Sequence, residues 1–267
     1  MGLLDGRIAI VTGAGAGIGY GIASRFVAEG AQVVAAEIDA ERCSALLAEF
    51  RQIDVVECDI RTLDGVEAVF AAADARGGCD VLVNNVGHYG RGRGAFHLQT
   101  EQEWDELFAV NLQHVLRCSQ RCIQRLVGRG APGAIVNVST IEAFRGIPSR
   151  AVYSAYKAAI TGLTKSLAVE YAHAGIRVNA IAPDVTETSQ VPYSKWLKPG
   201  DEAMIPAWVP LGRFGTPDDA AGVALFLASE LSAFVTGTTV HLDGGTFAAG
   251  GWFPTEEGGW TNRPRRP

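Results

Sequence analysis

Tyr153 and Lys157 lie four residues apart in the segment "NVSTIEAFRGIPSRAVYSAYK", residues 137–157. On a helix this spacing places both side chains on one face, whereas Tyr156 and Lys157 diverge by about a quarter turn. A phenol titrates near pH ~10, and an ammonium group within a few ångströms favours the phenolate by roughly one to three pKa units. The pair is therefore predicted to act in proton transfer, with Lys157 lowering the pKa of Tyr153.

Two neighbouring hydroxyl residues, Ser139 and Thr140, end the apolar run that precedes this pair. A hydroxyl at the end of a strand is expected to hold the substrate oxygen while Tyr153 exchanges its proton. Successive side chains of a strand point to opposite faces, so the two hydroxyls cannot serve equally. The residues alone leave the choice between them open.

A glycine-rich segment, "TGAGAGIG" at residues 12–19, follows the first apolar run and opens the first predicted helix. Gly13 permits a tight turn, while Gly17 and Gly19 let the backbone approach phosphate groups. The helix N-terminus supplies amide donors and a favourable dipole for a pyrophosphate. Because strand, turn and helix follow in this order, the segment predicts a dinucleotide site.

Glu37 ends the second predicted strand, 18 residues beyond Gly19. An acid at this place accepts hydrogen bonds from the adenosine ribose hydroxyls. A carboxylate would repel a 2′-phosphate, and Ala16 offers no cation to compensate, so the pattern favours NAD over NADP. The alternative is a solvated charge at the end of a strand. Asp59, after the third strand, is a candidate for binding the adenine amino group.

Short apolar runs alternate along the chain with longer amphipathic segments. Uninterrupted apolar runs such as "RIAIVT" and "AIVNVS" are typical of parallel strands covered on both faces. Their alternation with helices predicts an α/β fold, a doubly wound parallel sheet with right-handed crossovers. The predicted strands are 7–12, 32–37, 54–58, 81–84, 134–139, 177–181 and 238–242, and the predicted helices lie near 17–29, 40–51, 62–76, 101–127, 151–173 and 217–229.

The pattern contains no repeat and no interdomain linker, which predicts one domain over residues 1–250. An irregular stretch at about 184–215, rich in proline and bulky residues, is longer than a simple connector and is predicted to form a substrate lid. Residues 251–267 are expected to form a C-terminal tail, either poorly ordered or packed over a pocket or a neighbouring subunit.

Composition excludes several classes of function. The 267 residues carry a net charge of −6, which argues against a nucleic-acid surface. No apolar run reaches transmembrane length, and the N-terminus lacks a secretory pattern. The five cysteines are scattered and odd in number, and the five histidines show no ligand-like pairing. We therefore expect a reduced, cytoplasmic enzyme that needs no disulfide and no metal.

Over nearly its whole length the sequence resembles the single-domain short-chain dehydrogenase/reductase family. The matching segments are TGAGAGIG, ECDI, NNVG, "AVNL" with Asn111, "IVNVST", Tyr153 to Lys157, "RVNAIAP", "RFGTPDD" and "VTGTTVHLDGG". The resemblance implies a seven-stranded Rossmann sheet, a homotetramer and nicotinamide-dependent chemistry at alcohol groups. It implies cofactor contacts at Gly13, Ala16, Gly17, Ile18, Gly19, Glu37, Asp59, Ile60, Asn85, Gly87, Tyr153, Lys157, Pro183 and Thr188.

The resemblance also implies a catalytic tetrad. Tyr153 is the acid and base, Lys157 tunes it and binds the nicotinamide ribose, and Asn111 anchors a water that links Lys157 to solvent. The family's serine lies 13 residues before the tyrosine, which assigns the substrate-orienting hydroxyl to Thr140, with Ser139 as the alternative. Thr140 in place of the family's serine is thus one departure from the family pattern. Asp184 is a second, because the family commonly has a glycine after the proline at this position.

The predicted substrate wall mixes apolar, aromatic and charged residues and includes the loop 88–96. It suits a ring-bearing secondary alcohol, and the segments 84–87 and 137–157 resemble the dehydrogenases that oxidise cis-dihydrodiols of aromatic acids such as benzoate or p-cumate. Arg145 or Arg150 would then pair with a carboxylate, the alternative being two surface arginines. A reductase of terpene, steroid or other cyclic ketones and a non-catalytic nucleotide sensor remain alternatives. The substrate candidates are Glu142, Phe144, Arg145, Asp184, Val191, Trp196 and Trp208.

Overall fold

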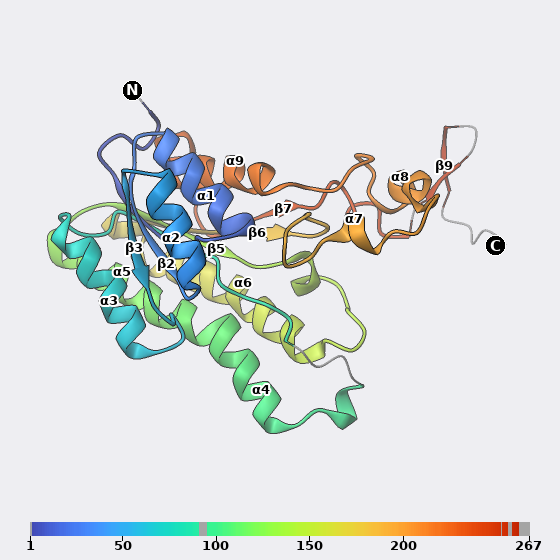
Figure 1. The fold of residues 1–267 in the computed structure, drawn as a ribbon, viewed down its shortest axis with the longest axis horizontal. Coiled ribbons are helices and arrows are strands. Elements are labelled where there is room, and N and C mark those ends of the chain that lie inside the picture. The colour runs from blue at the N-terminus through green and yellow to red at the C-terminus, as the bar shows by residue number, and fades with distance from the viewer. Residues whose placement is uncertain (1, 91–94, 252, 256–257, 262–267) are drawn as a thin grey trace.

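The computed structural model describes residues 2–90, 95–251, 253–255 and 258–261 (Figure 1). Part of the predicted substrate loop, residues 91–94, and most of the predicted tail therefore lie outside the described residues. Seven parallel strands form one sheet in the order β3-β2-β1-β4-β5-β6-β7. The strands are β1 (Ile8–Thr12), β2 (Gln32–Glu37), β3 (Ile53–Glu57), β4 (Val81–Asn84), β5 (Gly133–Val138), β6 (Ile176–Pro183) and β7 (Thr239–Leu242).

Helices cover both faces of the sheet, which confirms the predicted doubly wound Rossmann architecture. On one face, α1 and α9 lie against each other and, with α2, pack on the strands; on the other face lie α3, α5 and α6 (Figure 1). The main helices are α1 (Gly17–Ala28), α2 (Ala40–Glu49), α3 (Leu63–Ala75), α4 (Glu101–Phe108), α5 (His114–Arg129), α6 (Ala151–Tyr171) and α9 (Pro217–Ala228).

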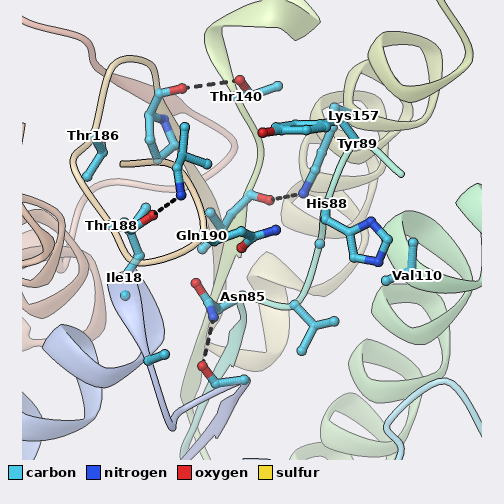
Figure 2. A pocket seen from close by; sticks show the side chains of 18 of the residues that line it. Ile18, Asn85, His88, Tyr89, Val110, Thr140, Lys157, Thr186, Thr188 and Gln190 are labelled. Carbon is cyan, nitrogen blue, oxygen red and sulfur yellow. Dashed lines mark hydrogen bonds between the residues drawn. The ribbon is translucent and has the colours of Figure 1, made fainter. Parts of the chain in front are cut away.

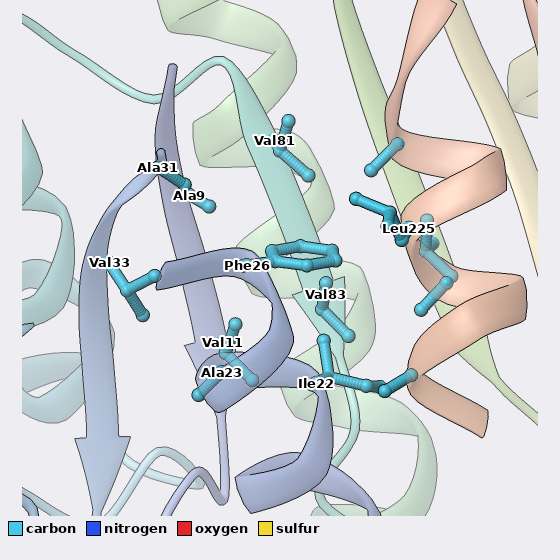
Figure 3. Close-up of a cluster of buried hydrophobic side chains, with 14 of the residues drawn as sticks. Ala9, Val11, Ile22, Ala23, Phe26, Ala31, Val33, Val81, Val83 and Leu225 are labelled. Carbon is cyan, nitrogen blue, oxygen red and sulfur yellow. The ribbon is translucent and has the colours of Figure 1, made fainter. Parts of the chain in front are cut away.

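The apolar side chains of the strands explain the two layers. β1 is fully buried, so its successive residues contribute alternately to a core on each face of the sheet. On the α1 and α9 side, Phe26 packs among Ile22, Val83 and Leu225 (Figure 3). Fully burying one such side chain contributes roughly 1.5–3 kcal/mol. The two cores hold the carboxyl ends of the strands at one edge.

One predicted helix, 101–127, is two helices joined by a π-helical turn, η2 (Ala109–Gln113). A capping box of Thr100 and Glu103 opens α4, and Thr216 with Asp219 caps α9 in the same way. π-turns occur most often at functional sites, and this one contains the buried Asn111.

The region predicted as a lid follows β6 and contains two short helices, α7 (Tyr193–Trp196) and α8 (Ile205–Trp208). Short 3-10 turns are η1 (Phe96–Leu98), η3 (Ile141–Ala143), η4 (Ala172–Ala174), η5 (Asp201–Met204) and η6 (Glu230–Ser232). Near the C-terminus, β8 (Phe253–Pro254) and β9 (Trp260–Thr261) form a separate two-stranded ribbon that lies beside α8 (Figure 1). Within the described part of the chain, no helix is long and apolar enough to cross a membrane.

Candidate active site

A cavity of about 780 Å³ opens at the carboxyl ends of the strands. It runs from the end of β2 and the start of α1 to the N-terminal part of α6 and the lid (Figure 2). In doubly wound sheets ligands bind at this edge, where the strand order reverses. The order here reverses between β1 and β4, which lie side by side. The cavity therefore occupies the position expected for a dinucleotide and a substrate placed end to end.

The glycine-rich turn forms one end of the cavity. Gly13 and Gly17 have φ angles of 64° and 56°, which glycine adopts without strain. A Cβ at Gly19 would lie 2.0 Å from the Gly13 carbonyl oxygen, so this close packing requires glycine. No side chain caps α1, because the N-cap residue is Ala16. The uncapped amides of the first helical turn could bind a phosphate group, and the residues present fit a dinucleotide.

The end of β4 closes the same part of the site. The Asn85 side chain donates hydrogen bonds to the carbonyl oxygens of Thr12 (2.9 Å) and Gly13 (3.3 Å), and this holds the glycine-rich turn against β4 (Figure 2). The Thr12 hydroxyl accepts hydrogen bonds from the backbone amides of Asn85 and Val86. The turn is thus held rigidly before any ligand binds.

Glu37 is buried at the end of β2 and lines the adenosine end of the cavity. Its carboxylate accepts hydrogen bonds from the backbone amides of Gly15 (2.9 Å), Ile38 (2.9 Å) and Asp39 (3.1 Å). The side chain is therefore not a solvated strand-end charge. Arg42 lies 4.0 Å from the same carboxylate and also lines the cavity.

Asp59 and Ile60 line the cavity where the adenine is expected. The Asp59 carboxylate is paired with Arg61, and the shortest of their hydrogen bonds measures 2.6 Å. Hydrogen bonds from Arg61 lower the pKa of Asp59. The carboxylate is therefore held ionised beside a cation that sequence reasoning did not single out.

The opposite end of the cavity holds Tyr153, Lys157 and Thr140. α6 begins at Ala151, so Tyr153 and Lys157 lie on its first turns, as their spacing predicts. The Thr140 hydroxyl lies at the cavity and donates a hydrogen bond of 3.2 Å to the Pro183 carbonyl oxygen (Figure 2). The Ser139 hydroxyl instead donates to the carbonyl oxygen of Lys157 (3.0 Å), a backbone atom of α6.

The pKa values of this group differ from the sequence prediction. Burial raises the pKa of Tyr153, and the Thr140 hydroxyl beside it partly offsets the rise. Burial lowers the pKa of Lys157 to about 8. The pKa of Tyr153 thus shifts in the direction opposite to the predicted one, because both groups are desolvated and their charged forms are disfavoured.

Asn111 and Gly87 connect the π-turn to Lys157. The Asn111 side chain donates to the carbonyl oxygens of His88 (2.9 Å) and Leu107 (3.0 Å), and its Oδ1 accepts from the His88 amide (3.2 Å). A Cβ at Gly87 would lie 2.7 Å from Lys157 Nζ and 3.0 Å from Asn111 Oδ1. Only glycine lets these two side chains approach the end of β4. Lys157 Nζ donates to the Val138 carbonyl oxygen at 2.9 Å.

The remaining cofactor candidates and part of the substrate set also line the cavity. Pro183 and Thr188 face it, and the Thr188 hydroxyl accepts a hydrogen bond from the amide of Val191 (Figure 2). Of the predicted substrate residues, the cavity is lined by Glu142, Asp184, Val191 and Trp196.

Three predicted substrate residues do not line the described cavity, which corrects the sequence prediction. Phe144 packs against His241 and Phe247, with ring centroids 4.7 and 6.1 Å away. Trp208 packs against Tyr193 and Phe214. The Arg145 guanidinium is paired with carboxylates, as described below. Each of these side chains contacts other side chains of the protein, and residue type and sequence position alone do not reveal such contacts.

Several lining residues lay outside the predicted set. Tyr89 is in the loop expected near the substrate, and its ring meets Tyr153 edge to face with centroids 6.2 Å apart. The Arg150 guanidinium lies 3.5 Å from the centroid of the Tyr89 ring. Tyr193 and Gln190 come from the lid. The only signal for them was their position in segments already assigned to the substrate wall.

The likeness to known proteins extends over most of the chain. A family model described as "Enoyl-(Acyl carrier protein) reductase" matches residues 13–246. Galactitol 2-dehydrogenase of Agrobacterium fabrum is 36% identical over 254 residues, which cover 91% of this chain and 98% of that protein. This match covers nearly the full length of both chains.

Two solved structures bear on the fold and the cofactor. A 3-ketoacyl-(acyl-carrier-protein) reductase from Brucella melitensis complexed with NADH is 33% identical, with a TM-score of 0.82 over 91% of this chain and 99% of the other. A candidate 2-deoxy-d-gluconate 3-dehydrogenase from Agrobacterium tumefaciens with bound NADP is 35% identical, with a TM-score of 0.80 over 92% and 98%. With the sheet and the site described above, these matches show an oxidoreductase of alcohols or ketones that uses NAD(H) or NADP(H). The chain belongs to the short-chain dehydrogenase/reductase family.

Proposed function

We propose that the protein is an NAD-dependent dehydrogenase that oxidises one hydroxyl of a vicinal diol on a ring, with a cis-dihydrodiol as the leading candidate. The observation that carries this proposal is the Glu142 carboxylate, which lines the cavity close to the Tyr153 phenol. A diol with one hydroxyl at Thr140 and Tyr153 can present its second hydroxyl to Glu142. A mono-alcohol cannot make this second hydrogen bond, and the Glu142 carboxylate then keeps its pair with Arg145.

The rest of the substrate end is largely aromatic. Tyr89, Tyr193 and Trp196 line it and offer flat apolar surface to a ring. Arg150 lines the cavity on the face of the Tyr89 ring, whereas Arg145 does not line the described cavity, so a substrate carboxylate would meet Arg150. The proposal therefore covers ring diols with and without a carboxylate, and Arg150 would distinguish them.

The proposed chemistry is divided between the cofactor and four side chains. When bound, an oxidised nicotinamide would supply the hydride acceptor and a positive charge that favours the phenolate form of Tyr153. Thr140 holds the substrate oxygen, and Tyr153 takes the hydroxyl proton. Lys157 holds the nicotinamide ribose, and Asn111 fixes the start of the loop at His88.

The preference for NAD rests on Glu37. Its carboxylate lies at the adenosine end of the cavity and carries a negative charge that three backbone amides stabilise. A 2′-phosphate placed near it would be repelled, whereas ribose hydroxyls can donate to its remaining lone pair. Arg42, at 4.0 Å, offsets part of this repulsion.

The alternative enzyme is a reductase of a terpene, steroid or other cyclic ketone. The aromatic wall formed by Tyr89, Tyr193 and Trp196 suits such a substrate as well. Such a ketone has a single reacting oxygen and does not need to hydrogen-bond to Glu142. Comparison of Glu142 variants on diols and mono-alcohols therefore separates the two functions.

The decisive experiment measures NADH formation across cis-dihydrodiols with and without a carboxylate, polyols, terpene alcohols and hydroxysteroids. We expect the highest kcat/KM for a cyclic cis-diol. Glu142→Gln should raise KM for the diol about tenfold, as expected for the loss of a hydrogen bond to a charged group, and leave a cyclic mono-alcohol unchanged. Tyr153→Phe should abolish turnover while retaining NAD binding. Equal loss for both alcohols in Glu142→Gln, or unchanged turnover in Tyr153→Phe, would refute the proposal.

A further inference from the structure

Asp184 follows Pro183, the last residue of β6, and its side chain is only 7% exposed. Its Oδ2 accepts a hydrogen bond of 2.9 Å from Arg145 Nη2 and another from the Thr246 hydroxyl. Arg145 Nη2 also donates to Glu142 Oε1 at 3.0 Å. Oδ2 of the Asp184 carboxylate is thus engaged by two protein groups, while the residue also lines the cavity.

These contacts join three segments that are distant in the sequence. Arg145 belongs to the loop after β5, Asp184 begins the lid region, and Thr246 belongs to the turn after β7. The aromatic rings of Phe144, His241 and Phe247 pack together and connect two of the same segments. We call the Arg145–Asp184–Thr246 contact the latch.

The latch adjoins the backbone groups that hold the Thr140 hydroxyl. The Thr140 hydroxyl donates to the carbonyl oxygen of Pro183, the residue before Asp184. The same hydroxyl accepts a hydrogen bond of 3.3 Å from the amide of Glu142, which is itself paired with Arg145. The Pro183 carbonyl that accepts from Thr140 therefore directly precedes Asp184 of the latch. The Glu142 amide that donates to Thr140 belongs to a residue that pairs with Arg145 of the latch.

We propose that Asp184 is a positioning residue, which acts through Arg145 and Thr246 to fix the Pro183 carbonyl and the loop 141–145 and so sets the direction of the Thr140 hydroxyl. This role rests on the proposed function insofar as Thr140 holds the substrate oxygen. A glycine at 184 would leave Arg145 paired with Glu142, and the Thr246 hydroxyl would keep only its longer contact of 3.4 Å with Asp243 Oδ2 among the described residues. The proposal also gives a role to Arg145, which pairs with two carboxylates and does not line the described cavity.

Asp184→Asn and Thr246→Val test the latch, because each weakens it with little change in volume. We expect kcat to fall about tenfold in Asp184→Asn and by less in Thr246→Val, since small misplacements of a reacting group lower kcat strongly. The KM for the nucleotide should change less than about twofold. Thr246→Ser keeps the hydroxyl group and should therefore retain the kcat of the wild type. Asp74→Asn, which removes a distant surface pair with Arg125, is the matched control.

A double-mutant cycle distinguishes positioning from general loosening of the fold. If Asp184 acts through Thr140, Asp184→Asn should lower the residual rate of Thr140→Ala by less than about twofold. Losses that multiply in the double variant, or an unchanged kcat in Asp184→Asn, would overturn the proposal.

Amide hydrogen exchange gives a readout that needs no substrate. In Asp184→Asn we expect faster exchange within residues 141–145 and 184–188, with no change at the control residues 32–37 of β2. If no diol is oxidised, the proposed function fails while this exchange still tests the latch. Unchanged exchange in all these segments would refute the latch even in an active enzyme.

Discussion

Lys157 is a buried ammonium group, and burial lowers its pKa from 10.5 to about 8. Between these two values the unfolded chain keeps a proton that the folded chain has released. The free energy of unfolding therefore rises with pH across this window, and below it both states carry the proton. The charged side chain, which the chemistry requires, thus destabilises the fold at neutral pH.

We predict that Lys157→Met changes this pH dependence. Wild-type protein should gain stability relative to Lys157→Met between about pH 7.5 and about pH 9.5, because only the wild type loses the buried charge. Urea unfolding midpoints at both pH values measure the difference. Lys165→Met, at an exposed position of the same helix, is the control and should follow the wild type. A wild-type midpoint that falls relative to Lys157→Met as pH rises would contradict the prediction.

Thr140 and Ser139 differ in what their hydroxyl groups contact. Thr140 lies beside the Tyr153 phenol, whereas the Ser139 hydroxyl donates to a backbone oxygen of α6. We predict that Thr140→Ala lowers kcat by roughly two to four orders of magnitude, the usual range for a group that stabilises a developing charge or assists proton transfer. Ser139→Ala should lower stability by about 1 kcal/mol and kcat much less. Steady-state kinetics and thermal unfolding of both variants give the comparison, and the reverse order of kcat would assign the role to Ser139.

At the scale of elements, local patterns were sufficient for the framework. Apolar runs located all seven strands of the sheet to within about two residues. The π-turn at 109–113 was not predicted. The prediction assigned these residues to one continuous helix, and the π-type hydrogen bonding is seen in the backbone.

The substrate end was predictable only in part. Its segments were identified correctly, because they follow the carboxyl ends of β4, β5 and β6. The inward or outward direction of a loop side chain depends on partners elsewhere in the chain. Arg145 turned to Asp184, and Trp208 to Tyr193 and Phe214, and no local pattern encodes those contacts.

Glu37 joins three elements at the adenosine end: the end of β2, the glycine-rich turn and the segment leading into α2. We predict that Glu37→Gln lowers the ratio of kcat/KM for NAD to that for NADP by at least about tenfold, because the charge that repels a 2′-phosphate is lost and Arg42 is freed. Kinetics with both cofactors and titration of NADH and NADPH binding measure the ratio.

Glu41→Gln is the control for this prediction, since Glu41 is exposed in the first turn of α2 and does not line the described cavity. It should leave the ratio unchanged. A Glu37→Gln enzyme with unaltered selectivity, or a wild type that prefers NADP, would show that Glu37 serves only to hold the turn.

At the scale of the whole molecule, the two apolar cores fix the edge of the sheet where the site lies. The outer faces of the helices carry a second feature, a groove on the surface. A groove of about 440 Å³ lies between α5 and α6 and includes Leu116, Ile123, Leu163 and Leu167. Leu116 is 41% exposed there. An apolar groove between two long helices is typical of a surface that another chain covers.

We predict that this α5–α6 face joins two copies of the chain and that the protein is a homotetramer, as its resemblance to the family implies. A closed symmetric assembly lets one self-complementary face bury the groove in both copies at once. Analytical ultracentrifugation should give a mass of about four times 28.2 kDa for the wild type. Leu116→Arg should reduce the mass, because it places a charge in the contact, whereas Leu47→Arg on the exposed side of α2 should not. A wild type that sediments as a monomer, or a Leu116→Arg variant of unchanged mass, would place the groove outside any interface.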